Sequence, residues 1–258
     1  MAGPFLALVG LFVGALSTAA VLLGGTVASL SLGPIGPANP SGPMAAPATV
    51  SSAPVLTSAS QAAAENAAAA CPGLDWTLLA GAVLIDPALA ASLTSVATAL
   101  CTSPDRPATL VALLPGPTEG QVALVLAQAL AANPALNGEA ATAIAFAAIN
   151  LGVPYRWGGT GPGGFDCSGL TLEAYRAAGV TIPRVAQDQF DAGPQLPPGA
   201  ALQPGDLVFF GPGPHGIEHV GLYIGAGDMI DAPHTGADVR IESLWRSDLV
   251  GATRPAGG

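Results

Sequence analysis

The sequence predicts an α+β fold with an antiparallel sheet in its C-terminal part. Two helical patterns come first, GEAATAIAFAAINLG at residues 138–152 and CSGLTLEAYRAAGV at residues 167–180. Four short segments follow, apolar or alternating and separated by Gly, Pro and Asp: GDLVFF, HVGLYIG, DMIDAP and DVRIESL. Such segments are typical of strands joined by tight turns. Helix, turn, helix and strand meander form an α+β order, and we place this domain at residues 139–258.

The composition excludes several classes of protein. Of the 258 residues only 9% are charged and 50% are hydrophobic, whereas disordered chains combine low hydrophobicity with high charge. The net charge is −10 and all seven basic residues are Arg. Nucleic acid is therefore not an expected partner, because phosphate binding requires a basic surface. The Ala-, Gly- and Pro-rich, Lys-free composition is associated with high-GC, for example actinobacterial, genomes.

The first 32 residues predict a membrane segment. From Pro4 to Leu32 the chain is uncharged and mostly apolar, which exceeds the about 20 residues that a helix needs to span a bilayer. We expect an anchor at residues 1–32. A cleaved signal is the first alternative, since Thr26-Val27-Ala28 resembles a cleavage site, and a buried core helix is the second. An anchor or a signal would export the remainder of the chain. Residues 33–60 hold six prolines and no charge, which predicts an extended linker.

Residues 61–138 predict a small all-α domain. LDWTLLAGAVLI and EGQVALVLAQALAAN have the apolar density of buried helices, and Asp75 is placed to cap the first of them. Cys71 and Cys101 bracket much of this region. In an exported chain two cysteines most often form a disulfide, which we expect here; two buried free thiols are the alternative.

Cys167 is the candidate nucleophile. It follows a glycine-rich loop and Asp166 and opens a helical pattern, and a helix N-terminus favours the thiolate form that a nucleophile requires. His219 opens an apolar strand and is a candidate general base, and His234 comes later at a distance that suits orienting its ring. A small buried cysteine and two surface histidines are the alternatives.

The same segments match, in order, the motifs of a known family. YRWGGTGPGGFDCSGL, GDLVFF, HVGLYIG and IDAPHTG followed by VRIESL closely resemble the NlpC family of cell-wall cysteine peptidases over about residues 140–250. The resemblance implies a papain-like fold and hydrolysis of an amide bond in peptidoglycan stem peptides, usually between D-glutamate and a diamino acid. It places the protein outside the cytoplasm, membrane-anchored or secreted to the cell wall.

The resemblance also implies roles for individual residues. It makes Cys167 the nucleophile, His219 the base and His234 the third, polar member of the triad. Four further residues match positions that shape the oxyanion and substrate site: Tyr155, Asp166, Ser168 and Arg184. This chemistry requires no metal and no organic cofactor.

The stretch CPGLDWTLLA in the middle region weakly resembles the start of lytic transglycosylases. Asp86 stands where the resemblance places a catalytic glutamate, but it is a shorter acid and Pro87 follows it. We therefore expect a degenerate, non-catalytic helical domain. Autoinhibition of the peptidase by residues 61–135 is a hypothesis.

Two other patterns suggest different sites. H-G-I-E-H at residues 215–219 matches a zinc-peptidase motif, but that motif requires a helix and the surrounding Pro and Gly oppose one. On an extended chain its rings would lie about 13 Å apart, so we expect no metal and a loop position for His215. The glycines of residues 158–164 lack the Lys of a phosphate-binding loop and predict a turn. Trp157 and Trp245 are expected in the core or at a rim rather than as ligand platforms.

Two functions therefore follow from the sequence. The first is a peptidoglycan endopeptidase held near the wall, and the alternative is a non-catalytic wall-binding or scaffold module. An anchor, a helical domain and a peptidase together resemble wall-opening proteins of envelope-spanning machines, including conjugation complexes. Remodelling during growth or division is equally compatible with these parts.

Overall fold

The computed structural model describes residues 56–114 and 117–256. The predicted anchor or signal at residues 1–32 and most of the predicted linker at residues 33–60 lie outside the described residues. Within the described ranges, no helix is both long and apolar enough to cross a membrane.

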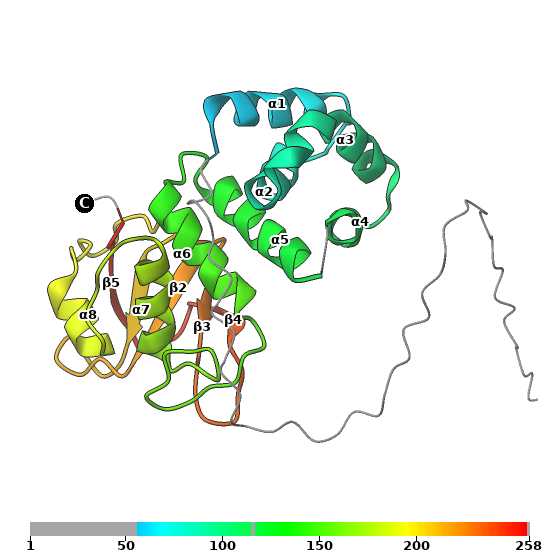
Figure 1. Ribbon diagram of the computed structural model, residues 1–258. Coiled ribbons are helices and arrows are strands. Elements are labelled where there is room, and N and C mark those ends of the chain that lie inside the picture. Colours follow the sequence, from blue (N-terminus) through cyan, green and yellow to red (C-terminus); the bar gives the residue numbers. More distant parts are fainter. Residues whose placement is uncertain (1–55, 115–116, 257–258) are drawn as a thin grey trace, which may run out of the picture. The chain divides into compact units, whose positions relative to one another are not determined.

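A five-stranded antiparallel sheet forms the centre of the C-terminal part (Figure 1). Its strands are β1 (Leu207–Phe210), β2 (His219–Gly225), β3 (Asp228–Asp231), β4 (Arg240–Ser243) and β5 (Leu249–Thr253). Their order across the sheet is β4-β3-β2-β1-β5, and every neighbouring pair is antiparallel. The first four strands match the segments expected from the sequence. The fifth was not expected and pairs with the free edge of β1.

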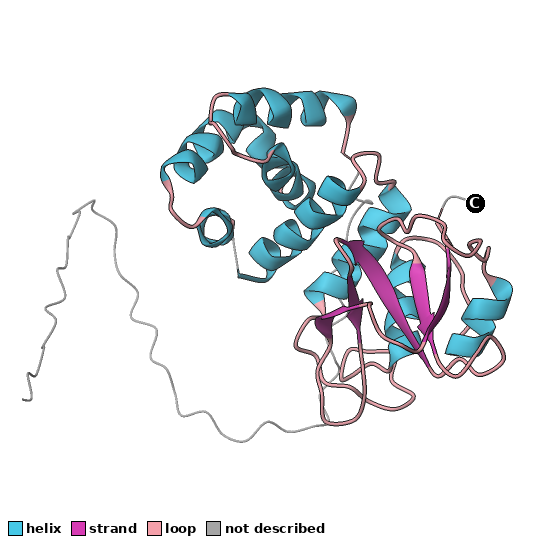
Figure 2. Ribbon diagram, turned by 180° about the vertical axis from the view of Figure 1, so that it is seen from behind, coloured by secondary structure: helices cyan, strands magenta, loops and turns pink. Residues whose placement is uncertain are grey.

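The two faces of the sheet are covered differently. Helices α6 (Gly138–Ile149) and α7 (Cys167–Ala177) pack on one face, where Val220, Leu222 and Ile224 of β2 are fully buried. The other face, turned to the viewer in Figure 2, carries loops rather than these helices. A second apolar cluster is buried there: Val208, Phe210, Met229, Leu244 and Ala252. Each large apolar side chain buried in this way stabilises the fold by about 1.5–3 kcal/mol.

Further helices precede this α+β arrangement. They are α1 (Ser58–Ala69), α2 (Trp76–Ile85), the 3-10 helix η1 (Pro87–Ser92), α3 (Leu93–Thr102), α4 (Arg106–Leu113) and α5 (Pro117–Ala132). The two patterns predicted as helices correspond to α2 and α5. Asp75 caps α2 as expected, since its carboxylate accepts a hydrogen bond from the backbone N–H of Thr77. A disulfide joins Cys71, in the α1–α2 loop, to Cys101 near the end of α3.

Helix α5 packs on α2 and also contacts the sheet. The side-chain amide of Gln128 donates to the carbonyl oxygen of Gly225 at 3.1 Å and to the carboxylate of Asp228 at 3.0 Å. A Cβ added to Gly225 would lie 2.7 Å from the Cβ of Ala132, so glycine permits the close approach of α5 to the end of β2. The helical region is therefore docked against the β2–β3 turn.

Asp86, which stands where the weak resemblance to lytic transglycosylases places a catalytic glutamate, has a structural role. It ends α2, and its carboxylate accepts a hydrogen bond from the backbone N–H of Ala88 at 3.0 Å, which caps η1. A capping carboxylate followed by Pro87 at the first position of a helix is a common arrangement. This contact accounts for the residue without a catalytic role.

Candidate active site

Cys167 is the first residue of α7. The preceding residue, Asp166, is the N-cap, and its carboxylate accepts a hydrogen bond from the backbone N–H of Gly169 at 2.7 Å. Gly169 allows the helix start to pack closely on the preceding turn, because an added Cβ would lie 2.0 Å from the carbonyl oxygen of Gly159. The sequence motif D-C-S-G thus sets the cysteine at a helix N-terminus, where the helix dipole favours a thiolate.

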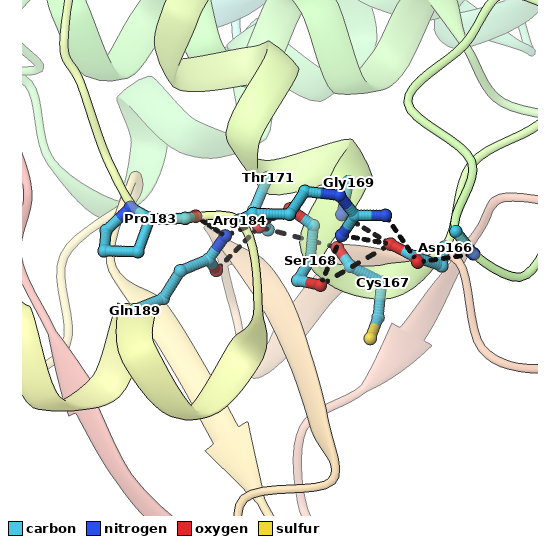
Figure 3. A network of polar contacts seen from close by, with 9 residues as sticks. Asp166, Cys167, Ser168, Gly169, Thr171, Pro183, Arg184 and Gln189 are labelled. Carbon is cyan, nitrogen blue, oxygen red and sulfur yellow. Dashed lines mark hydrogen bonds and ion pairs between the residues drawn. The ribbon is translucent and has the colours of Figure 1, made fainter.

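Asp166 also links the helix to two other segments. Its second oxygen accepts a hydrogen bond from the backbone N–H of Gly158 at 2.9 Å. The guanidinium of Arg184 donates to both carboxylate oxygens, at 3.0 and 2.7 Å, and to the hydroxyl of Ser168 at 3.0 Å. The hydrogen bond to Asp166 raises the pKa of Arg184, against the lowering effect of burial. Figure 3 shows this network, from which the sulfur of Cys167 points away.

A buried amide supports the same helix start from the other side. Gln189 lies on α8 (Ala186–Ala192) and is 2% exposed. Its Nε2 donates to the carbonyl oxygens of Ser168 and Pro183, and its Oε1 accepts from the hydroxyl of Thr171 (Figure 3). Gln189 is not predictable from the sequence, because a seven-residue helix with one buried glutamine has no distinctive pattern.

His219, the first residue of β2, is paired across the sheet with Phe210. Its Nε2 donates a hydrogen bond to the carboxylate of Asp231 at 2.6 Å, within the buried interior. Burial alone would lower the pKa of His219, but its hydrogen bonds with Asp231 and Cys167 and the negative charges of both raise that pKa to about 9. Since Nε2 is engaged by Asp231, Nδ1 is the nitrogen left for the sulfur.

The predicted third triad residue, His234, makes no hydrogen bond with His219 in the described part of the chain. It is exposed, and its Nδ1 is hydrogen-bonded to the backbone oxygen of Thr235 at 3.0 Å. The hydrogen bond to the ring of His219 that was predicted for His234 is made by Asp231, the last residue of β3. The reason is geometric: β3 runs antiparallel beside β2, and its final residue reaches the start of β2, whereas His234 follows after the chain has left the strand.

Tyr155 borders the same cleft as Cys167 and His219. It is half-buried, and its backbone N–H donates to the carbonyl oxygen of Ala237 at 2.8 Å. Burial, followed by the negative charges of Cys167 and Asp166, raises the pKa of Tyr155. The phenol therefore remains a hydrogen-bond donor.

The structure has a cleft of about 1240 Å³ at the start of α7. All seven predicted catalytic and substrate-site residues border it: Tyr155, Asp166, Cys167, Ser168, Arg184, His219 and His234. Its lining begins at Tyr155 and ends at Arg246, so none of the described residues of α1–α6 contributes to it. The structure therefore gives no support to the hypothesis that residues 61–135 block this cleft.

The zinc motif does not form a metal site in the described part of the chain. His215 is exposed in the loop before β2, and residues 215–219 are not helical. Among the described residues no cluster of three or more His, Cys, Asp or Glu side chains could hold a metal ion. The cleft is bordered by both Cys167 and His219.

Comparison with protein families gives one match in this region. Residues 152–254 match the family model described as the NlpC/P60 family. This range includes every cleft residue discussed above.

Known proteins also resemble this part of the chain. The chain is 41% identical over 124 residues to the gamma-D-glutamyl-L-lysine dipeptidyl-peptidase of Bacillus subtilis, covering 46% of this chain and 42% of that protein. It is 40% identical over 116 residues to peptidoglycan endopeptidase RipB of Mycobacterium tuberculosis, covering 40% and 47%. With the P60 domain of an antigen from M. avium subspecies paratuberculosis it shares 34% identity and a TM-score of 0.43, covering 46% and 96%. The chain spans less than half the length of the two curated relatives.

Proposed function

Because residues 152–254 belong to the NlpC/P60 family, we propose that this chain is a cysteine peptidase that hydrolyses an amide bond in peptidoglycan stem peptides. The observation that carries the proposal is that Cys167 and His219 border the same cleft and that the buried carboxylate of Asp231 contacts His219. Cys167 stands at a helix N-terminus, and His219 is hydrogen-bonded to a buried carboxylate. In this proposal Asp231 replaces His234 as the third member of the triad.

The reaction starts from a thiolate–imidazolium pair. The raised pKa of His219 keeps its ring protonated at neutral pH, and Asp231 stabilises that charge from the Nε2 side. The sulfur of Cys167 forms a bond to the scissile carbonyl carbon, and the carbonyl π electrons move to the oxygen. The resulting oxyanion is held by the backbone N–H of Cys167 in the first turn of α7, with the hydroxyl of Tyr155 as a second donor.

The intermediate then collapses and the C–N bond breaks. The leaving nitrogen takes a proton from the imidazolium of His219, which leaves a neutral ring beside a thioester on Cys167. A water molecule loses its proton to that ring and attacks the thioester carbon. The carbon–sulfur bond breaks, the carboxylic acid product leaves, and the thiolate–imidazolium pair is restored.

The remaining parts of the chain suit a protein of the cell wall. We propose that the bond cleaved joins D-glutamate to a diamino acid. Residues 1–32 would direct the domain to the outer side of the membrane, as an anchor or as a signal, and residues 33–60 would act as a tether. Residues 61–138 form a non-catalytic helical domain in this proposal. Local wall opening for an envelope or conjugation complex, or wall remodelling, is the role that such an assembly serves.

The test is digestion of purified peptidoglycan by the full chain and by its Cys167→Ala variant, with the soluble fragments identified by mass. We expect the wild type to release soluble peptides that begin with the diamino acid, because the D-glutamate end stays on the glycan strand, and the variant to release none. Binding to peptidoglycan by both proteins without release by either would instead identify a scaffold module. A Cys71→Ala, Cys101→Ala control with Cys167 intact should still cleave, since neither of these cysteines borders the cleft.

A further inference from the structure

Trp157 is an aromatic side chain at the rim of the cleft that the proposed reaction does not use. It borders the cleft beside Tyr155 and Gly158, yet it is 86% exposed. Of the core and rim positions predicted for Trp157, the structure shows the rim position. Aromatic residues contribute most to folding when they are buried, so packing does not explain a large indole in solvent at this point.

The backbone around Trp157 is held in place. The N–H of Arg156 donates to the carbonyl oxygen of Phe165 at 2.8 Å. The N–H of Gly159 donates to the carbonyl oxygen of Arg156, also at 2.8 Å. Between them, the N–H of Gly158 donates to the carboxylate of Asp166. Since Asp166 also caps α7, the position of the indole is tied to the helix that carries Cys167.

The faces of the indole are open. Among the described residues, no aromatic ring and no guanidinium stacks on Trp157; the ring pairs and the cation–π contact of the described chain involve other residues. A rigid, exposed aromatic plane beside a nucleophile has the properties of a binding surface, because it offers a large contact area and has few rotamers to lose.

We infer that Trp157 is a subsite for a sugar ring of the glycan strand to which the stem peptide is attached. This inference rests on the proposed function and names a second part of the same substrate. A stem peptide built of alanine, glutamate and a diamino acid has no broad flat apolar group. A pyranose ring does, because the C–H groups on one of its faces form an apolar plane that fits an indole. The structure thus assigns to the cleft a preference for stem peptides still linked to sugar.

Two substrates test this directly: a disaccharide–tetrapeptide and the same tetrapeptide with an N-acetyl cap, each assayed for kcat/KM. We expect the wild type to prefer the sugar-linked substrate by about tenfold, the size of one good aromatic contact. Trp157→Leu should abolish the preference and Trp157→Tyr should retain part of it. Trp245→Ala is the matched control, because Trp245 is 75% exposed but does not border the cleft. It should keep the full preference.

The inference is overturned if Trp157→Leu retains the preference, if Trp245→Ala loses it equally, or if the wild type has none. Failure of the proposed function gives a different result, namely cleavage of neither substrate. In that case binding of the two compounds to Cys167→Ala protein, measured by calorimetry with and without Trp157→Leu, decides the matter. Tighter binding of the sugar-linked compound that depends on Trp157 supports the subsite, and equal binding refutes it.

Discussion

The carboxylate of Asp231 lies 2.6 Å from Nε2 of His219, and both residues are buried. Asp231 is at the end of β3 and His219 at the start of β2, so the pairing of these two strands makes the contact. The carboxylate fixes the tautomer and the orientation of the ring and leaves Nδ1 for the sulfur. It also stabilises the protonated ring, which connects the hairpin to the pH dependence of the proposed reaction.

Asp231→Asn should lower activity and shift its pH dependence. The amide keeps the shape but removes the negative charge, so the pKa of His219 falls from its raised value of about 9 and the imidazolium is lost at lower pH. We expect kcat/KM at pH 8 to drop by about 100-fold. The alkaline limb of the pH profile of kcat/KM should move to lower pH.

His234→Asn is the matched control for that substitution. His234 borders the same cleft but bonds only to the adjacent backbone of Thr235 in the described hydrogen-bond network. Its replacement should reduce kcat/KM by less than about fivefold and leave the alkaline limb in place. A shifted limb in His234→Asn with an unshifted one in Asp231→Asn would return His234 to the triad.

The pKa of His219 should also appear in the stability of the fold. In the folded chain it is raised from 6.5 to about 9, so the folded state holds the proton more tightly than the unfolded state does. The resulting stabilisation is fully present below pH 6.5 and is lost as the pH rises through about 9. We expect the free energy of unfolding, measured by urea denaturation, to fall by on the order of 2 kcal/mol across this window.

His219→Gln should flatten that decrease. His215→Gln should leave the decrease unchanged, because His215 is exposed in a loop and its contact with solvent changes little on unfolding. An equal slope in wild type and His219→Gln would show that the His219–Asp231 contact does not hold the proton in solution.

Much of the fold follows from local sequence signals. Strands β1 to β4 lie in apolar or alternating segments separated by Gly, Pro and Asp, and α7 begins directly after a capping aspartate. Strand β5 (Leu249–Thr253) has a glycine in its middle and is only partly buried. Its extended conformation comes from pairing with β1, a tertiary effect that strand propensity does not capture. Helix α8 is too short for a periodic pattern.

In the candidate site, too, some relationships between residues are local in the sequence and others depend on strand pairing. Cys167 and Asp166 lie together in one motif, so their relation is local. The partner of His219 depends instead on how β2 and β3 align, and that register shifts between Tyr223 and Gly225. A histidine three residues further along is an attractive candidate by residue type alone. Counting along the hairpin, with alternate side chains on opposite faces, was the signal that could have favoured Asp231.

Asp166→Ala should destabilise the protein more than an ordinary cap substitution. The side chain caps α7, fixes Gly158 and pairs with Arg184, and it is 8% exposed. We expect a loss of about 3 kcal/mol in the free energy of unfolding, together with slower alkylation of Cys167. Asp75→Ala removes an exposed cap on α2 and should cost about 1 kcal/mol. If Asp166→Ala and Asp75→Ala lowered the free energy of unfolding by similar amounts, the contacts of Asp166 with Gly158 and Arg184 would add no stability beyond that of the helix cap.

Removal of the disulfide should separate stability from activity. Cys71 and Cys101 are 30 residues apart, and closing a loop of that length restricts the unfolded chain enough to stabilise the fold by about 3–4 kcal/mol. Cys71→Ala with Cys101→Ala should therefore lower the free energy of unfolding by that amount. The cleft is bordered only by residues from Tyr155 onward in the described chain, so kcat/KM of the folded double variant at 25 °C should stay within about twofold of wild type. A large fall in kcat/KM under conditions where circular dichroism shows the variant folded would mean that the helical region controls the cleft through α5, whose Gln128 holds the β2–β3 turn.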